Sequence, residues 1–104
     1  MSSPPNLYFR KEGIIYQVDV QEIVFIESHE RCLHIHTLSE RLEIPYITLK
    51  KVLNDIGEYG FVQCSRNTIV NRKYIAYIDK SNGYLGMKPN RQKIEIGLNF
   101  KQNI

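Results

Sequence analysis

The stretch FVQCSRNTIVNRK, residues 61–73, places a polar and basic insert between two short apolar runs. The apolar runs Phe61-Val62 and Ile69-Val70 predict short strands that bury their side chains. Between them lies the cluster Ser65-Arg66-Asn67, and arginine and asparagine are the side chains that bond guanine and adenine edges in a major groove. The same cluster also fits an ordinary surface turn, because serine and asparagine bond their own backbone.

Charge is distributed unevenly along the 104 residues, whose formal net charge is +3. Residues 1–58 contain six Lys or Arg against nine Asp or Glu, whereas residues 59–104 contain eight against two, so the halves carry −3 and +6. A basic half that includes residues 61–73 is expected of a surface that binds a polyanion, although solubility alone also accounts for it. The length and a hydrophobic content of 42% predict one folded domain.

Composition also limits the compartment. The two cysteines, Cys32 and Cys64, match neither a disulfide framework nor the paired spacing of a zinc site, so we expect both to be reduced in a cytoplasm. Residues 1–5 do not form a signal peptide and are expected to be a flexible leader or a linker stump, with residues 6–104 as the domain. No stretch approaches the roughly 18 apolar residues of a membrane span, so membrane insertion is not expected.

Hydrophobic periodicity predicts a mainly β chain of about nine or ten short strands with one short helix near residues 48–56. The run IVFIE at residues 23–27 is almost continuously apolar, which indicates a strand buried on both faces near the middle of a sheet. Leu49 and Val52 begin the helical spacing, and Thr48 is a suitable N-cap. A helix of about two turns must pack on the sheet to be stable.

The segment CLHIHT, residues 32–37, alternates between apolar and polar side chains and predicts a half-buried strand. A hairpin tip at Ser39-Glu40 would pair Ile35 of this strand with Ile44 of the next. One face of the hairpin is then core and the other is exposed.

Neither a metal site nor an active site is predicted. Cys32, His34 and His36 share one face of a strand and, with Glu43, offer atom types that zinc accepts. Same-face Cβ atoms along a strand are about 7 Å apart, however, which is too far for three to converge on one ion. The chain lacks the nucleophile, phosphate-loop and His-Glu-x-x-His motifs of common enzymes, so we expect no cofactor and no catalytic activity.

The order of these elements resembles the LytTR DNA-binding domain, the output module of many bacterial response regulators. The resemblance rests on the run EIVFIES at residues 22–28, the alternating strands that follow, the helix near residue 49 and the block FVQCSRNTIVN at residues 61–71. It implies an elongated stack of small antiparallel sheets with one short helix. It also implies a bacterial transcription regulator whose loops enter successive major grooves of double-stranded DNA at repeated half-sites.

The resemblance assigns base-reading side chains to loops of this fold. The loop after the EIVFIES run holds His29 and Arg31, of which Arg31 is the better match. The turn within residues 61–71 holds Ser65, Arg66 and Asn67, with Arg66 at its centre. Ser65 stands where the family often has histidine.

A third base contact of the family usually comes from an arginine after the final strand, where this chain has Leu98 or Asn99. Leucine cannot hydrogen-bond a base edge, and asparagine reaches less far than arginine, so this contact is left open. Lys101 can compensate on phosphate. Arg72 and Lys73 are expected to bind phosphate near the preceding turn, although two solvated charges at a strand start fit equally well.

The resemblance further implies a second copy on the DNA and an upstream receiver or sensor domain, so that this chain is an excised domain or a lone regulator. It gives Asn71 a structural role in its turn. Two alternatives stay open from the residues themselves. One is a β-domain that offers its strand edges to a partner protein, and the other is a single-strand binder that stacks bases on exposed tyrosines.

Overall fold

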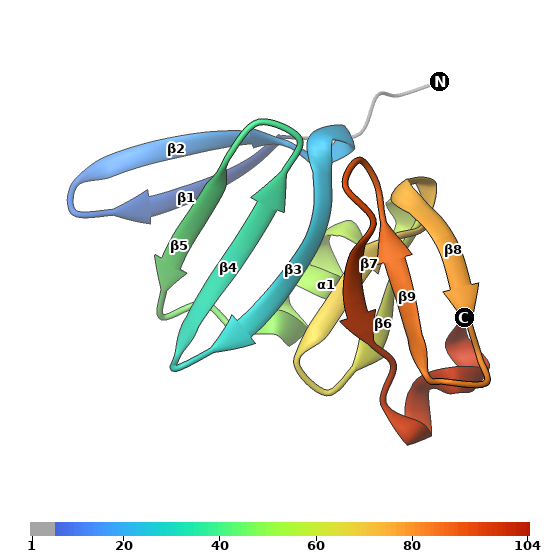
Figure 1. Ribbon diagram of the computed structural model, residues 1–104. Helices are drawn as coiled ribbons and strands as arrows, with labels where there is room; N and C mark the ends of the chain where they lie inside the picture. The colour runs from blue at the N-terminus through green and yellow to red at the C-terminus, as the bar shows by residue number, and fades with distance from the viewer. Residues whose placement is uncertain (1–5) are drawn as a thin grey trace.

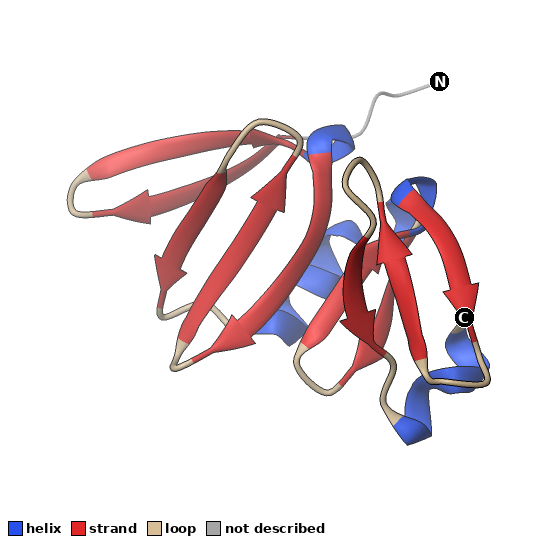
Figure 2. Cartoon of the chain, viewed as in Figure 1, coloured by secondary structure: helices blue, strands red, loops and turns tan. Residues whose placement is uncertain are grey.

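The computed structural model describes residues 6–104 (Figure 1, Figure 2). Within them, ten strands form three antiparallel sheets, accompanied by one α-helix. The prediction of a mainly β fold with one short helix is confirmed, whereas the leader expected at residues 1–5 lies outside the described part. The largest sheet has the order β5-β4-β3-β7-β6. Its strands are β3 (Ile23–His29), β4 (Cys32–Thr37), β5 (Arg41–Pro45), β6 (Phe61–Ser65) and β7 (Thr68–Asn71).

Two smaller sheets flank the five-stranded one. One is the hairpin of β1 (Asn6–Lys11) and β2 (Ile14–Asp19), and the other has the order β10-β9-β8. The strands of the latter are β8 (Ile75–Asp79), β9 (Tyr84–Met87) and β10 (Gln92–Glu95). Short 3-10 helices connect or end the elements at η1 (Val20–Glu22), η2 (Gly57–Tyr59), η3 (Arg72–Tyr74) and η4 (Leu98–Asn103).

Strand β3 occupies the middle of the large sheet, as its continuous apolar run predicts, and it contributes to two separate cores. Ile23 and Ile26 pack into a cluster that includes the helix, whereas Val24 and Phe25 pack into a second cluster with residues of β9 and β10. All four side chains are buried. Because both faces of β3 are buried, its side chains are apolar along most of the strand and become polar only near its end.

Helix α1 (Leu49–Ile56) begins after Thr48, whose Oγ1 accepts a hydrogen bond from the Lys51 N–H at 3.2 Å. This N-cap confirms the predicted start of the helix. The helix buries Leu49, Val52 and Ile56 against the large sheet. No helix within residues 6–104 has both the length and the apolar content needed to cross a bilayer.

The β4–β5 hairpin differs in register from the prediction. Ile35 pairs with Leu42 rather than with Ile44, because the turn is centred on residues 38 and 39, one residue before the predicted tip at Ser39-Glu40. The Thr37 Oγ1 accepts hydrogen bonds from the backbone N–H groups of residues 39 and 40, at 3.3 and 3.0 Å, and thereby stabilises a turn one residue earlier, which moves each pairing partner by two residues. Since the error is two residues, every side chain keeps its predicted face.

Candidate nucleic-acid interface

Two of the predicted reading turns lie side by side at one end of the large sheet. Strands β3 and β7 are antiparallel neighbours, with Glu27 opposite Thr68, so the end of β3 meets the start of β7. A backbone hydrogen bond of 2.7 Å from the Ser28 N–H to the Asn67 carbonyl joins the two turns directly. They appear along the lower edge of the sheet in Figure 1, where β3 turns into β4 and β6 into β7. The fold therefore brings Arg31 and Arg66 to the same edge.

The turn between β3 and β4 has a strained backbone. His29 and Cys32 pair across it, and the two residues between them, Glu30 and Arg31, both have positive φ, at 51° and 64°. A two-residue hairpin turn of this kind prefers glycine or asparagine, and other side chains cost roughly 1–2 kcal/mol per residue there. Strain of this kind often marks a functional position. The turn holds the exposed Arg31 away from the sheet, with the exposed His29 beside it.

The turn between β6 and β7 is held by side-chain hydrogen bonds instead of strain. A bulge between Gln63 and Ser65 bends β6 before the turn. The Ser65 Oγ accepts from the Asn67 N–H at 3.3 Å, and the Gln63 Nε2 donates to the Arg66 carbonyl at 3.4 Å. The side chains of Arg66 and Asn67 are exposed and make no hydrogen bond to residues 6–104. Their bonding groups remain free for a ligand.

A third segment, the start of η4, lies against β6. The Gly97 N–H donates to the Cys64 carbonyl at 2.9 Å, and the Phe100 N–H donates to the Gly97 carbonyl at 2.9 Å. A Cβ added to Gly97 would lie 3.0 Å from the Phe100 ring and 3.5 Å from the Ser65 Cα, so glycine permits this close approach. The next two side chains, Leu98 and Asn99, are both exposed.

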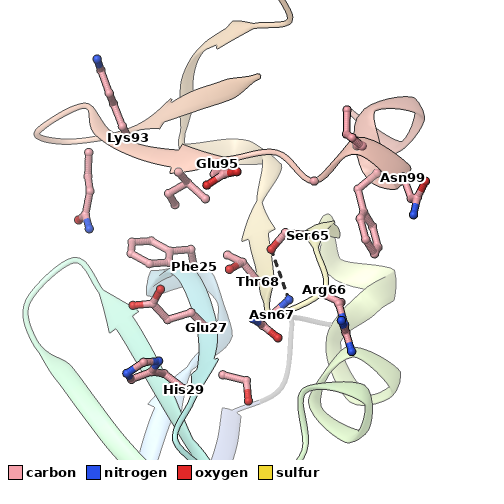
Figure 3. A pocket seen from close by; sticks show the side chains of 16 residues that line it. Phe25, Glu27, His29, Ser65, Arg66, Asn67, Thr68, Lys93, Glu95 and Asn99 are labelled. Carbon is pink, nitrogen blue, oxygen red and sulfur yellow. Dashed lines mark hydrogen bonds between the residues drawn. The ribbon is translucent and has the colours of Figure 1, made fainter. Parts of the chain in front are cut away.

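The end of β3, the β6–β7 turn and the start of η4 border an open hollow of about 550 Å³, with β10 along its other side (Figure 3). His29 lines this hollow, whereas Arg31 does not. Two carboxylates, those of Glu27 and Glu95, line it together with Arg66. The Lys93 side chain borders the hollow but points away from it, with its Nζ 4.6 Å from the centre of the Tyr84 ring. A cavity with mixed charge is a poor phosphate site, because the carboxylates repel an anion. The lining residues are Phe25, Glu27, Ser28, His29, Ser65, Arg66, Asn67, Thr68, Gln92, Lys93, Ile94, Glu95, Gly97, Leu98, Asn99 and Phe100.

Strand β10 contributes polar residues that the sequence did not single out. Gln92 and Lys93, both on this strand, are among the residues that line the hollow. Lys93 and Glu95 alternate with the buried Ile94 and Ile96, so the pattern of a half-buried strand was visible. What the pattern could not show was which exposed face lies over the turn at Arg66, because the two segments are distant in the chain.

Arg72 and Lys73 lie at the other end of β7. They follow that strand, whose four residues span roughly 13 Å at the usual rise, so they do not join the reading turns. The Arg72 Nη2 donates to the Asn103 carbonyl at 2.7 Å, and the Lys73 Nζ lies 5.2 Å from the centre of the Tyr74 ring. Lys101 borders a separate hollow beside β9 and also stays outside the group.

Asn71 is buried, and it bonds at two points. Its Nδ2 donates to the Ile23 carbonyl at 3.0 Å, and its Oδ1 accepts from the Lys73 N–H at 3.2 Å. The side chain thus joins β7 to the start of β3 and caps η3. This geometry agrees with the structural role that the resemblance implied for Asn71.

The two histidines on β4 lie beside different carboxylates. His34 lies 3.7 Å from the Glu43 carboxylate and His36 lies 3.3 Å from that of Glu27, but no group of three possible ligands converges anywhere in residues 6–104. Burial lowers the pKa of His36, whose ring stacks on Phe25 with centres 4.0 Å apart. The lowered pKa favours the neutral form of the His36 ring, against the opposing effect of the Glu27 carboxylate.

Cys64 is poorly suited to act as a nucleophile. Cys64 is fully buried, and burial raises the pKa of its thiol to about 11. At neutral pH the group is a thiol, whereas the reactive species of a cysteine nucleophile is the thiolate.

The family model of the LytTr DNA-binding domain matches residues 13–104 of this chain. The chain therefore belongs to the LytTR family. This is a family of DNA-binding rather than catalytic domains. A solved structure with the same fold is the LytTr DNA-binding domain assigned to a methyl-accepting/DNA response regulator of Bacillus cereus. It is 14% identical, with a TM-score of 0.80, and the match covers 96% of this chain and 93% of that one. A comparison with curated proteins gives no match.

Proposed function

We propose that this LytTR domain reads base sequence in double-stranded DNA as the output part of a cytoplasmic bacterial transcription regulator. The observation that carries the proposal is the meeting of three segments at one edge of the molecule. The end of β3 with the turn that follows it, the β6–β7 turn and the start of η4 are distant in the chain, yet they meet beside one hollow with exposed polar side chains. Protruding turns of this kind can enter a major groove, where each base pair presents a distinct bonding pattern.

The base-reading side chains in this proposal are Arg31 and Arg66, supported by His29, Ser65 and Asn67, with Asn99 on the third segment. Arginine bonds guanine through two donors at once, and asparagine does the same for adenine. The two carboxylates in the hollow disfavour phosphate there, which supports contacts to bases at its rim. In this proposal, phosphate is bound by cationic side chains outside the hollow, and Lys101 on η4 is the first candidate.

The proposal includes two copies of the domain on repeated half-sites, with an upstream receiver or sensor domain controlling their assembly. One domain contacts only a short stretch of DNA through these turns, and two copies on one duplex gain affinity by acting together. The alternative of single-strand binding on tyrosines has less support. Only two of the tyrosines are exposed, Tyr8 on β1 and Tyr46 in the turn after β5, and a stacking row needs several.

Selection of bound duplexes from a random library tests this function. We expect a recovered motif that occurs as a regular repeat, and binding of that duplex should weaken steeply with salt. The same sequence as a single strand is the control and should bind more weakly. A library without enrichment, or equal binding of single strand and duplex, would contradict the proposal.

A further inference from the structure

Leu98 is an apolar side chain at the rim of the hollow, among polar ones. It is 84% exposed, and it directly follows the glycine that fixes the third segment against β6. A single exposed leucine is ordinary on a protein surface. This one differs from the others by its place, since it lines the same hollow as Arg66 and Asn67.

The backbone around Leu98 is held on both sides. Before it, the Gly97 N–H is bonded to the Cys64 carbonyl at 2.9 Å. After it, η4 is anchored through Asn103, whose Nδ2 donates to the Gln63 carbonyl at 3.2 Å and whose carbonyl accepts from Arg72 at 2.7 Å. The Leu98 backbone is thus held in place relative to the β6–β7 turn, which favours a specific contact by its side chain.

We propose that Leu98 contacts the 5-methyl group of a thymine and makes the domain select thymine at that position. The methyl group is the apolar feature that distinguishes thymine in the major groove, and apolar side chains recognise it by contact. This inference rests on the proposed function, because it needs the β6–β7 turn to enter the groove. It assigns to the third segment a contact that requires no hydrogen bond.

Replacing thymine with deoxyuridine tests the contact, because deoxyuridine lacks only the methyl group. In a duplex recovered by selection, each thymine is replaced in turn, and the affinities of the wild-type chain and of Leu98→Ala are compared. For the wild type we expect one position in each half-site where loss of the methyl weakens binding about fourfold, the size expected for one buried methyl group. In Leu98→Ala that sensitivity should disappear, while the other positions keep theirs.

Ile15→Ala is the matched control. Ile15 is also an exposed apolar residue, at 60%, but it lies on β2, away from the hollow. Its replacement should leave the whole deoxyuridine profile unchanged. Thermal unfolding of both variants should match the wild type, because neither side chain is buried.

The outcomes separate this inference from the function on which it rests. If the wild-type chain enriches no duplex, the proposed function is wrong and the thymine contact is wrong with it. If it enriches a duplex and Leu98→Ala shows the same deoxyuridine profile as the wild type, the contact alone is wrong. A profile in which no thymine methyl matters to the wild type also overturns the contact.

Discussion

The two ends of strand β7 carry the same pair of residue types and use them differently. At its start, Arg66 and Asn67 are exposed and their side chains make no hydrogen bond to residues 6–104. At its end, Asn71 is buried between two backbone partners, and Arg72 is bonded to the Asn103 carbonyl. Residue type alone therefore does not assign a role. The role of each side chain depends on whether the fold places a hydrogen-bond partner within its reach.

The largest effect is expected from Asn71→Ala. The change leaves the Ile23 carbonyl and the Lys73 N–H without their partner, and unsatisfied groups of this kind cost about 2–3 kcal/mol together. Urea unfolding measures the loss of stability. Asn67→Ala is the matched control at the other end of the strand, and it should change the free energy of unfolding by less than about 0.5 kcal/mol. Equal losses of stability in the two variants would contradict the distinction between a structural end and an exposed end of β7.

Arg66→Ala should act on DNA rather than on the fold. We expect a loss of roughly 1–3 kcal/mol in binding free energy at the selected site and little loss on random duplex, because a base contact is sequence-dependent. Titration of both duplexes measures this, with the unfolding midpoint as a check that the domain is intact. A similar loss on both duplexes would make Arg66 a phosphate contact.

Arg72→Ala should loosen η4. The lost hydrogen bond joins an exposed arginine to a carbonyl, so we expect a change of about 1 kcal/mol or less in stability. Hydrogen exchange gives the sharper readout, since the Phe100 and Ile104 amides, which are bonded within η4, should lose protection. Unchanged protection of these amides would mean that the Arg72 bond does not hold the helix.

The smallest effect is expected from Lys73→Ala. Because Lys73 lies beyond β7, away from the reading turns, the slope of the logarithm of affinity against the logarithm of salt concentration should stay the same. Lys101→Ala provides the comparison, with a slope reduced by about 0.9 if this residue binds one phosphate. A reduced slope for Lys73→Ala would mean that Lys73, at the end of β7, does contact DNA phosphate.

Local patterns in the sequence predicted most of the fold. The apolar run of β3, the alternation of β4 and the capped helix at Thr48 each depend on neighbouring residues, and each is found. The predicted β4–β5 register was wrong, because the Thr37 side chain stabilises a turn that comes earlier than the predicted tip at Ser39-Glu40.

Long-range contacts were beyond the reach of such patterns. The bond between Arg72 and Asn103 joins residues that are 31 positions apart, and it changes how Arg72 is interpreted. The place of Lys93 across the hollow from Arg66 depends likewise on how two sheets pack. The two turns were assigned to the site through resemblance to a family, and their meeting at one edge emerged only from the pairing of β3 with β7.

The order β4-β3-β7-β6 also fixes a distance that the domain cannot adjust. The two turns are centred two strand spacings apart, about 10 Å at the usual 4.8 Å between strands. Base pairs follow one another about every 3.4 Å, so the turns are spaced like positions three steps apart on a duplex. A hydrogen bond between the Ser28 N–H and the Asn67 carbonyl joins the two turns directly. If both turns contact bases, the spacing of the strands sets the separation of the two contacts along the DNA. An operator with one base pair inserted between these contacts could then not align with both turns at once.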